Sequence, residues 1–496
     1  YATDRLNNAS SIGSITFTSY KVFNVRDYGA KGDGVADDTQ AVKSTVEAAR
    51  SYIASSSSSP PNPVIVYFPA GTYRITSLIS IHSNMIVRGV RAATSTATED
   101  QEGREGRGGG GGGGGESVIR LGMPFTAGSA VFKIEGAENV TVSRLVFDGQ
   151  RQLTGHNTPT NRVSALLIGH NSRNVNVRES VFRDWRYTAV MLYGNTNAIL
   201  IDSNVFRRNG NESKVTRVEE GITNDYDAAA LQTSTKADTP YSSIIARNLL
   251  EYSGRDAIRV VTAKNVLVDS NVARYSVRNG IAVEGSGTSH VTITNNTCEY
   301  NGGSGRYQGA GIVVRNKGGP YVTDVVVRNN TVRWNYDNGI DFNTVSNGLI
   351  EGNTIAYNGY LASPEVDNSP SNPYGWPAQE GSGILLYLSR DCTVRNNIIH
   401  DNNYMVLVAP AKNRYRGGIL VDPGRSNEFG SRMTGIVLTG NTERNEKGTH
   451  TWALKLGWLT SNSGLISGIR IIGERYESRI VQVPNAIDPA DPPVIQ

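Results

Sequence analysis

Apolar and polar residues alternate in short runs along most of the chain, and one form of this alternation returns many times after about residue 138. It can be written apolar-x-apolar-x-x-Asn-x-apolar, as in VTITNNTCEYN from residue 291 and VVVRNNTVRWN from residue 325. Apolar residues two positions apart predict β-strands rather than helices. The asparagines of the aligned copies form one column: Asn204, Asn248, Asn271, Asn296, Asn330, Asn353, Asn397 and Asn441. The shortest intervals in this column are about 23 residues, a period that is typical of a solenoid of strands.

A second apolar run precedes most copies, and a glycine or alanine introduces it, as in GIAVE from residue 280 and GIVVR from residue 311. Aligning these runs predicts two inward stacks, the first with Ile258, Ile281, Ile312, Ile340 and Ile384, the second with Val260, Val283, Val314, Phe342 and Leu386. Repeats that each add strands to the same sheets predict an all-β parallel β-helix of about 11–12 coils. Stacked asparagines suit its turns, because each amide can bond its neighbour in the next coil and asparagine tolerates left-handed backbone.

The beginning of the chain has a different pattern. The stretch FNVRDYGAKGDGVADDTQAV, from residue 23, has a glycine-rich turn in which Asp37 or Asp38 is expected to cap a helix reaching about Arg50. The run VIVYFPAGTYRIT, from residue 64, then predicts strands. A β-helix without a cover would expose its apolar end, so this helix is expected to cap the first coil.

The DYGAKGDGVADDTQAV and FPAGTYRI motifs strongly resemble the opening of the pectate-lyase superfamily of right-handed parallel β-helix proteins. The resemblance covers residues 20–90 by motif and the rest of the chain by coil pattern. It implies a right-handed β-helix with an N-terminal capping helix, and a role in carbohydrate chemistry. Similar proteins include polysaccharide lyases, glycoside hydrolases, epimerases and phage tailspikes, so the motifs do not fix the reaction. The chain lacks the Gly-His-Gly motif of polygalacturonases and the Asp-Pro-His motif of alginate epimerases, so no catalytic residue can be transferred by motif.

We expect three parts: an N-terminal arm with the capping helix at 1–60, the β-helix at 61–480 and an extended C-terminal tail at 481–496. Long insertions interrupt the coils at about 209–227, 233–241, 301–309, 360–381 and 404–417. Loops of this size on a compact scaffold are often functional. The fourth loop carries Tyr374 and Trp376, whose rings can either stack on sugars or pin the loop to the coils.

Composition narrows the classes of function. The 49 basic and 45 acidic residues leave a net charge of +4 without any Lys/Arg-rich block, which gives no support for nucleic-acid binding. The apolar runs are far too short to span a membrane. Two cysteines cannot organise a disulfide framework, and no Cys/His cluster has metal-site spacing. We therefore expect no cofactor, no nucleic acid and no membrane partner.

The strand within DNGIDFNT, residues 337–344, carries a carboxylate on its outward face, because Asp341 alternates with inward Ile340 and Phe342. The aligned outward positions form two columns, one with Arg259, Ala282, Val313, Asp341 and Leu385, the other with Val261, Glu284, Arg315, Asn343, Tyr387 and Asp422. Glu284 and Asp341 should then lie two coils apart in neighbouring columns, about 10 Å between backbones.

Two acids separated by ~6.5–9.5 Å are what inverting glycoside hydrolysis requires, one to protonate the leaving oxygen and one to activate water. Apolar neighbours make Asp341 the better general acid, and the adjacent Arg315 makes Glu284 the better general base. Asp256 and Asp422 are reserve carboxylates. The predicted catalytic residues are Asp341, Glu284, Arg315 and Asp256, and the predicted substrate contacts are Arg259, Asn343, Tyr387, Trp376, Tyr374 and Asp422.

Three other interpretations stay open. Glu284, Arg315 and Asp341 could form only a ladder of surface ion pairs, each contributing little. A lyase or epimerase acting on uronates could use Arg259 and Arg315, and Ca²⁺ would then be possible, although no alternation of aspartates across neighbouring coils suggests a Ca²⁺ site. A glycan-binding stalk without catalysis is the third. In each case we expect a secreted, extracellular protein with a polysaccharide or oligosaccharide partner, as a monomer or homotrimer.

Overall fold

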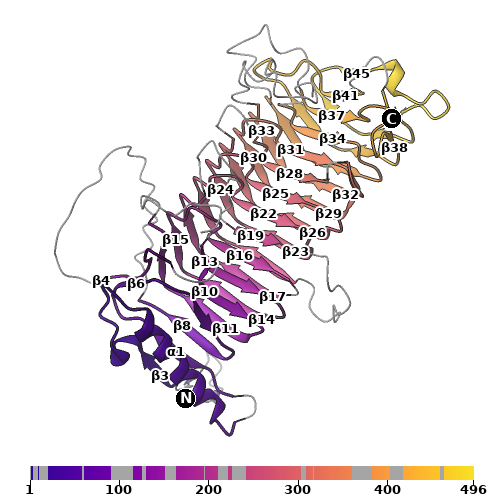
Figure 1. Cartoon of the computed structure of the whole chain (residues 1–496). Helices are drawn as coiled ribbons and strands as arrows, with labels where there is room; N and C mark the ends of the chain where they lie inside the picture. The colour runs from indigo at the N-terminus through magenta and orange to yellow at the C-terminus, as the bar shows by residue number, and fades with distance from the viewer. Residues whose placement is uncertain are drawn as a thin grey trace.

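The chain winds into a long spool of parallel strands in the computed structural model (Figure 1). Three long sheets run along the spool, and each complete coil contributes one strand to each sheet in turn. The structure describes residues 2–3, 9–10, 20–58, 61–90, 115–125, 130–150, 163–194, 196–210, 222–225, 242–302, 309–316, 318–359, 381–402, 417–457 and 463–496. The predicted all-β solenoid is confirmed.

Sheet I has 13 strands, and its register is the one that the aligned repeats predicted. Ile258 lies beside Ile281, Ile281 beside Ile312 and Ile312 beside Ile340. The strands of sheet I are β7 (Ile79–Ile81), β10 (Ala130–Glu135), β13 (Ser164–Gly169), β16 (Val190–Tyr193), β19 (Ile222–Asp225), β22 (Ile258–Val261), β25 (Ile281–Glu284), β28 (Ile312–Arg315), β31 (Ile340–Asn343), β34 (Ile384–Tyr387), β37 (Ile419–Asp422), β41 (Leu454–Leu456) and β45 (Ile480–Gln482).

Sheet II has 15 strands and follows sheet I in each coil. Its strands are β3 (Val22–Asn24), β5 (Val64–Tyr67), β8 (Met85–Arg88), β11 (Glu138–Ser143), β14 (Arg173–Arg178), β17 (Asn197–Asp202), β20 (Ser243–Ala246), β23 (Lys264–Asp269), β26 (Ser289–Thr294), β29 (Val322–Arg328), β32 (Val345–Glu351), β35 (Thr393–Arg395), β39 (Val437–Thr439), β43 (Arg470–Ile472) and β46 (Val494–Ile495).

Sheet III has 14 strands and completes the coil. Its strands are β4 (Asp33–Asp37), β6 (Gly71–Ile75), β9 (Ser117–Leu121), β12 (Val146–Asp148), β15 (Val181–Arg183), β18 (Val205–Arg207), β21 (Leu249–Glu251), β24 (Val272–Arg274), β27 (Thr297–Glu299), β30 (Thr331–Arg333), β33 (Thr354–Ala356), β36 (Ile398–His400), β40 (Thr442–Arg444) and β44 (Arg475–Tyr476). The three sheets hold slightly more strands than the predicted 11–12 coils, because the ladder asparagine does not mark the first and last coils.

The predicted asparagine column is a continuous hydrogen-bonded ladder at the turn between sheets II and III. From Asn204 to Asn441, each Nδ2 donates to the Oδ1 of the next member at 2.9–3.1 Å. Each next Oδ1 also accepts the backbone N–H of the preceding member, as Asn330 does from Asn296 at 2.8 Å. The expected left-handed backbone lies one residue earlier, for example at Asn295 and Asn329 with φ of 56° and 55°. The ladder residues are therefore there for their side-chain amides, and the residues before them make the turn.

A second ladder, which the repeat pattern did not predict, lies between sheets III and I. Asn301, Asn335, Asn358 and Asn402 connect in the same way at 2.8–2.9 Å. All four are fully buried. Where the two ladders run, they thus satisfy buried backbone groups at two of the three corners of a coil.

The inward columns of the three sheets fill the spool. Where neighbouring coils have Val283 and Val314, β31 has the larger Phe342. The extra volume is accommodated at Gly348 of β32, since a Cβ there would lie 2.6 Å from the Phe342 ring. The large and the small residue therefore compensate each other within one coil.

Helix α1 (Thr39–Ala54) covers the N-terminal end of the spool, as predicted (Figure 1). It buries Val42, Val46 and Ala49 against the first coils. Asp38 is at the N-cap position, but its carboxylate accepts the N–H groups of Lys31 and Gly32 instead of helix N–H groups. Asp37 caps the first residue by accepting the N–H of Thr39 at 3.0 Å.

Both ends of the chain contain strands of the long sheets. Strands β3 and β4, within the predicted arm at 1–60, already belong to sheets II and III. The predicted tail at 481–496 contributes the end of β45, the 3-10 helix η5 (Pro484–Ala486) and β46. A second 3-10 helix, η1 (Val25–Tyr28), precedes α1. Short two-stranded pairs join β1 (Ala2–Thr3) to β2 (Ala9–Ser10) and β38 (Arg432–Met433) to β42 (Leu465–Ile466). Among the described residues, no helix has the length and apolarity needed to cross a membrane.

Candidate active site on the outer face of sheet I

The outward side of sheet I carries the two columns that the aligned repeats predicted. Arg259 pairs with Ala282, Val313 with Asp341, and Asp341 with Leu385. In the neighbouring column Glu284 pairs with Arg315, Arg315 with Asn343, Asn343 with Tyr387, and Tyr387 with Asp422. The structure therefore brings the predicted residues of both columns together on one wall of the spool.

Glu284 is held by arginines on both sides. Its Oε1 accepts from Nε of Arg315 at 2.7 Å, and its Oε2 accepts from Nε of Arg259 at 2.9 Å. Nη2 of Arg255, a residue that the sequence analysis did not single out, lies 3.8 Å from Oε2. The Glu284 side chain is only 11% exposed, and the three arginine side chains are 18–23% exposed. This is a partly buried, charge-assisted cluster rather than a surface pair.

The electrostatics of Glu284 follow from this cluster. Burial alone would raise its pKa, but Arg315, then Arg259 and Arg255, outweigh burial and lower the pKa to about 2. Such a carboxylate stays ionised at neutral pH and accepts a proton weakly. The general-base role of Glu284 stays a prediction, and its surroundings favour a different task, that of fixing the arginine side chains.

Asp341 has apolar neighbours, as expected. Its partners across the sheet, Val313 and Leu385, are 1% and 2% exposed. Burial lowers the pKa of Arg315, but Glu284, with Asp256 and Asp341, raises it by more, so the charge of Asp341 acts on the same guanidinium. Asp341 is thus the carboxylate of this wall that combines apolar flanks with partial exposure. Its role as general acid stays a prediction.

Asp256 lies below this wall rather than on it. The residue is fully buried, and its Oδ1 accepts the backbone N–H and the Nδ2 of Asn279 at 3.1 and 2.7 Å. Its Oδ2 lies 3.3 Å from Nε of Arg255. These contacts fix the turn before β25 and orient Arg255, so a direct contact with substrate is not favoured by the geometry.

The C-terminal part of the wall contains a second cluster of polar residues. The Tyr387 hydroxyl donates to Glu428 at 2.8 Å, and Oδ1 of Asp422 accepts the N–H of Gly424 at 2.9 Å. Burial, together with that hydrogen bond, raises the pKa of Tyr387. Lys455, which follows Leu420 in the column of Asp341, is 7% exposed. Burial lowers the pKa of Lys455, and the charge of Asp422 opposes the change.

Sequence reasoning missed Lys455 and Arg255. Lys455 could have been found, because ALKLG at 453–457 has the same small residue followed by alternation as the earlier strands. Arg255 precedes the strand pattern, in a turn, so its approach to Glu284 depends on side-chain reach. Tyr374 and Trp376 lie outside the described residues. Within the part of the chain that the structure describes, no group of three or more His, Cys, Asp or Glu side chains could hold a metal ion.

Sheet III shows what a ladder of surface ion pairs looks like in this molecule. Along its outer face Arg207, Glu251, Arg274, Glu299 and Arg333 alternate in sign, with close pairs at 2.6–3.0 Å. The arginines there are 29–49% exposed, more than those around Glu284, whereas Glu251 and Glu299, at 5% and 10%, are as buried as Glu284 at 11%. Glu284 shares the alternation of this ladder. Asp341 does not, because its neighbours within its column are apolar.

Comparison with known families gives two matches. A model described as "Right handed beta helix region" matches residues 134–323 and 241–446. A model described as "Rhamnogalacturonase A/epimerase, pectate lyase-like" matches residues 22–108, the region of the DYGAKGDGVADDTQAV and FPAGTYRI motifs.

Solved structures with the same architecture have varied functions. The surface adhesin PfbA of Streptococcus pneumoniae superposes with a TM-score of 0.60 at 17% identity, over 89% of this chain and 93% of that one. The A-module of the mannuronan C-5 epimerase AlgE6 of Azotobacter vinelandii gives 0.52 at 16%, over 96% and 99%. The DFA-IIIase of Arthrobacter chlorophenolicus A6 gives 0.55 at 14%, over 85% and 94%. At these identities the likeness establishes the fold alone.

Curated relatives match over limited segments. Plasmin and fibronectin-binding protein A of S. pneumoniae is 24% identical over 278 residues, 55% of this chain and 34% of that protein. The "Non-secreted LysM effector LysM19" of Penicillium expansum is 48% identical over 68 residues, 14% of this chain and 5% of that protein. In both, the matched part is about a third or less of the relative's length.

Proposed function

Because the chain belongs to the right-handed β-helix family, whose model covers more than half of it, we propose that it is a carbohydrate-active enzyme that hydrolyses glycosidic bonds on the outer face of sheet I. The observation that carries the proposal is the position of Asp341. This partly exposed acid has apolar neighbours in its own column, and a carboxylate lies two strands away on either side, Glu284 in β25 and Asp422 in β37.

In the proposed reaction Asp341 is the general acid. Its carboxyl O–H donates a proton to the glycosidic oxygen as the bond from that oxygen to the anomeric carbon breaks. A second carboxylate removes a proton from water, whose oxygen forms the new bond to the anomeric carbon from the opposite face. One water is consumed, and two sugar chains leave.

In this proposal Asp422 takes the role of the base, although it is 1% exposed and its Oδ1 already accepts the N–H of Gly424, because two arginines hold Glu284. Two strands separate the backbones of Asp341 and Asp422 by roughly 10 Å, a spacing that leaves room for the water of an inverting mechanism. Glu284 lies at the same strand separation, but its two oxygens are engaged by Arg315 and Arg259. We therefore assign Glu284 to positioning. It holds the guanidinium groups of Arg259 and Arg315 on the wall, where their N–H groups can bind sugar oxygens beside the cleavage point.

A second candidate is a lyase or epimerase acting on uronates. The observation that favours it is Lys455, whose buried amine has a lowered pKa and stands in the same column as Asp341. A lysine of this kind can remove the proton next to a uronate carboxylate, and an arginine can neutralise that carboxylate. The resemblance to a mannuronan C-5 epimerase in fold is compatible with this chemistry.

The two reactions leave different products. The test is to incubate the protein with a panel of neutral and uronate polysaccharides, with and without EDTA. Reducing ends and the ultraviolet absorbance of unsaturated uronates are measured together. Hydrolysis predicts new reducing ends without absorbance, and no effect of EDTA. Absorbance that rises with the reducing ends would assign a lyase, and the absence of new reducing ends on every glycan would contradict hydrolysis.

The proposal also includes the location of the protein and its oligomeric state. A polysaccharide substrate would be met outside the cell, so we propose a secreted protein. The proposed wall lies within one chain, so a monomer suffices for the chemistry, and a homotrimer remains the alternative. Sedimentation velocity separates the two, since a trimer would have three times the mass of 53.5 kDa.

A further inference from the structure

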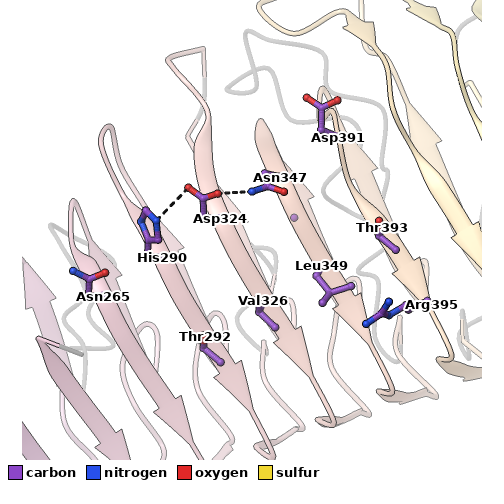
Figure 2. Close-up of a pocket in the computed structure, with 11 residues that line it drawn as sticks. Asn265, His290, Thr292, Asp324, Val326, Asn347, Leu349, Asp391, Thr393 and Arg395 are labelled. Atoms are coloured by element: carbon purple, nitrogen blue, oxygen red, sulfur yellow. Dashed lines mark hydrogen bonds and ion pairs between the residues drawn. The ribbon is translucent and has the colours of Figure 1, made fainter. Parts of the chain in front are cut away.

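A groove of about 630 Å³ lies on the outer face of sheet II, a different wall of the spool from the proposed active site (Figure 2). Its lining comes from five successive strands of that sheet and the turns that lead into them. Figure 2 shows two rows of side chains: a polar rim with Asn265, His290, Asp324, Asn347 and Asp391, and a floor with Thr292, Val326, Leu349 and Thr393.

The rim is a fixed polar edge. All five of its residues have left-handed backbone, with φ between 51° and 57°, so the same turn recurs in each coil. Asn347 donates to one oxygen of Asp324, and Nε2 of His290 lies 3.7 Å from the other. The side chains of His290 and Asp391 are 63% and 56% exposed, which leaves polar atoms available toward the groove.

The floor is one outward column of sheet II. Thr292 pairs with Val326, Val326 with Leu349, and Leu349 with Thr393. It therefore presents methyl and methylene groups in a row along the axis of the spool. On the side away from the rim, Arg395 donates from Nε to Glu351 at 2.7 Å.

We propose that this groove binds a linear, neutral glycan that lies along the spool axis. An apolar floor beside a polar edge suits a sugar ring, which packs its C–H face on the floor and directs its hydroxyls to carboxylate, amide and imidazole groups. Successive coils are about 4.8 Å apart, close to the length of one sugar residue, so each sugar meets the same pair of rim and floor positions. The lining has two carboxylates, Asp324 and Asp391, and one guanidinium, that of Arg395, which is paired with Glu351. It therefore carries no surplus of positive charge for a polyuronate, and the proposed chain is neutral.

The size of the groove agrees with this occupant, because sites for small ligands have volumes of about 300–1,000 Å³. The inference does not depend on the proposed function. A protein without any catalytic activity would still hold a glycan on sheet II, and an enzyme that acts on sheet I could use the groove to retain a long substrate.

The test is calorimetric titration with hexamers of β-1,4-linked glucose and β-1,3-linked glucose, and with hexagalacturonate as the acidic counterpart. The Asp341→Asn background prevents turnover. Leu349→Lys places an ammonium group on the floor, and Leu200→Lys is its matched control, since Leu200 occupies the same outward column of sheet II outside the groove. Circular dichroism checks that both variants keep the fold.

We expect one of the neutral hexamers to bind, Leu349→Lys to weaken that binding at least tenfold, and Leu200→Lys to leave it unchanged. Leu349→Lys should not weaken any binding of hexagalacturonate. Three results would overturn the proposal: no binding of either neutral hexamer, equal binding by Leu349→Lys, or a dimer in sedimentation that Leu349→Lys dissociates. The last would identify the face as a contact between two copies of the chain.

Discussion

Two nitrogens of Arg315 contact a single oxygen of Glu284, Nε at 2.7 Å and Nη2 at 2.6 Å. Arg259 holds the other oxygen from the preceding coil. A carboxylate so engaged acts as a fixed negative charge, and this separates the task of holding the arginines from the task of moving protons.

The first prediction concerns the stability that this cluster provides. The pKa of Glu284 falls from 4.5 to about 2 on folding, so at neutral pH its ionised form stabilises the native state by about 3 kcal/mol. Glu284→Gln should lower the free energy of unfolding at pH 7 by that order. Denaturant unfolding measures it, with Glu47→Gln as control, because Glu47 is 58% exposed where it lies 3.3 Å from Arg50 and 3.4 Å from His82.

The same cluster predicts a pH dependence. Because the folded pKa is depressed, the stabilisation is complete above pH 4.5 and is lost as the pH falls toward 2. The wild-type free energy of unfolding should therefore decrease across this window more steeply than that of Glu284→Gln. Parallel pH profiles for the two proteins would show that the arginines do not hold the carboxylate as the geometry indicates.

The buried asparagine ladder should contribute more to the free energy of unfolding than an exposed row of asparagines does. Asn330 donates to the carbonyls of Ile293 and Arg328 and accepts two hydrogen bonds from Asn296, all in a buried turn. Asn330→Ala leaves these groups unsatisfied and should cost about 2–4 kcal/mol of unfolding free energy. Asn139→Gly is the control and should cost much less. Asn139 joins Asn84 and Asn174 in an exposed row, and glycine accepts its left-handed backbone with φ of 58°. Equal losses of unfolding free energy in the two variants would show that the buried ladder adds no more stability than an exposed row.

Phe342 and Gly348 should show strong coupling in a double-mutant cycle. Phe342→Val opens a cavity and Gly348→Ala places a methyl group against the Phe342 ring, so each alone should destabilise the protein by about 1–3 kcal/mol. The added methyl fills part of the cavity, so the double variant should be more stable than the sum of the two losses predicts. Additive losses in denaturant unfolding would contradict the compensation between these two residues.

The division of roles on sheet I predicts different pH–rate profiles for two carboxylate variants. Asp422→Asn removes the proposed base, so it should lower kcat and abolish the acidic limb of the kcat/KM profile. Glu284→Gln should weaken substrate binding and stability while the acidic limb stays in place. Rates measured from pH 3 to 9 on the cleaved glycan check this. An acidic limb that disappears with Glu284→Gln instead would restore Glu284 as the base.

Much of the fold followed from the sequence because a strand period of two and a fixed turn leave little freedom in register. One column of asparagines sets the coils, and the isoleucines of sheet I then fall beside one another, as Ile281 and Ile312 do. The second ladder was missed because Ser253 and Ser276 stand in its column before Asn301, so the asparagines do not form a continuous series.

The candidate site was predicted only in its outline. The alignment placed Glu284, Arg315 and Asp341 on one face, since the side that a residue faces follows from its register. It could not show that Arg255 joins the cluster or that Asp256 turns inward to Asn279, because both depend on turn conformation. The groove of sheet II could not be predicted from the sequence. Its polar rim consists of residues with left-handed backbone, and these residues follow no apolar repeat.

The most direct measurement for the proposed chemistry is the turnover of Asp341→Asn on a glycan that the wild-type protein cleaves. The matched control is Asp148→Asn, because Asp148 also lies on an outward strand position, on sheet III, paired with Arg183. We predict that Asp341→Asn lowers kcat by about 10²–10⁴-fold with its unfolding free energy retained, and that Asp148→Asn keeps wild-type kcat. A wild-type kcat for Asp341→Asn would exclude Asp341 as the general acid.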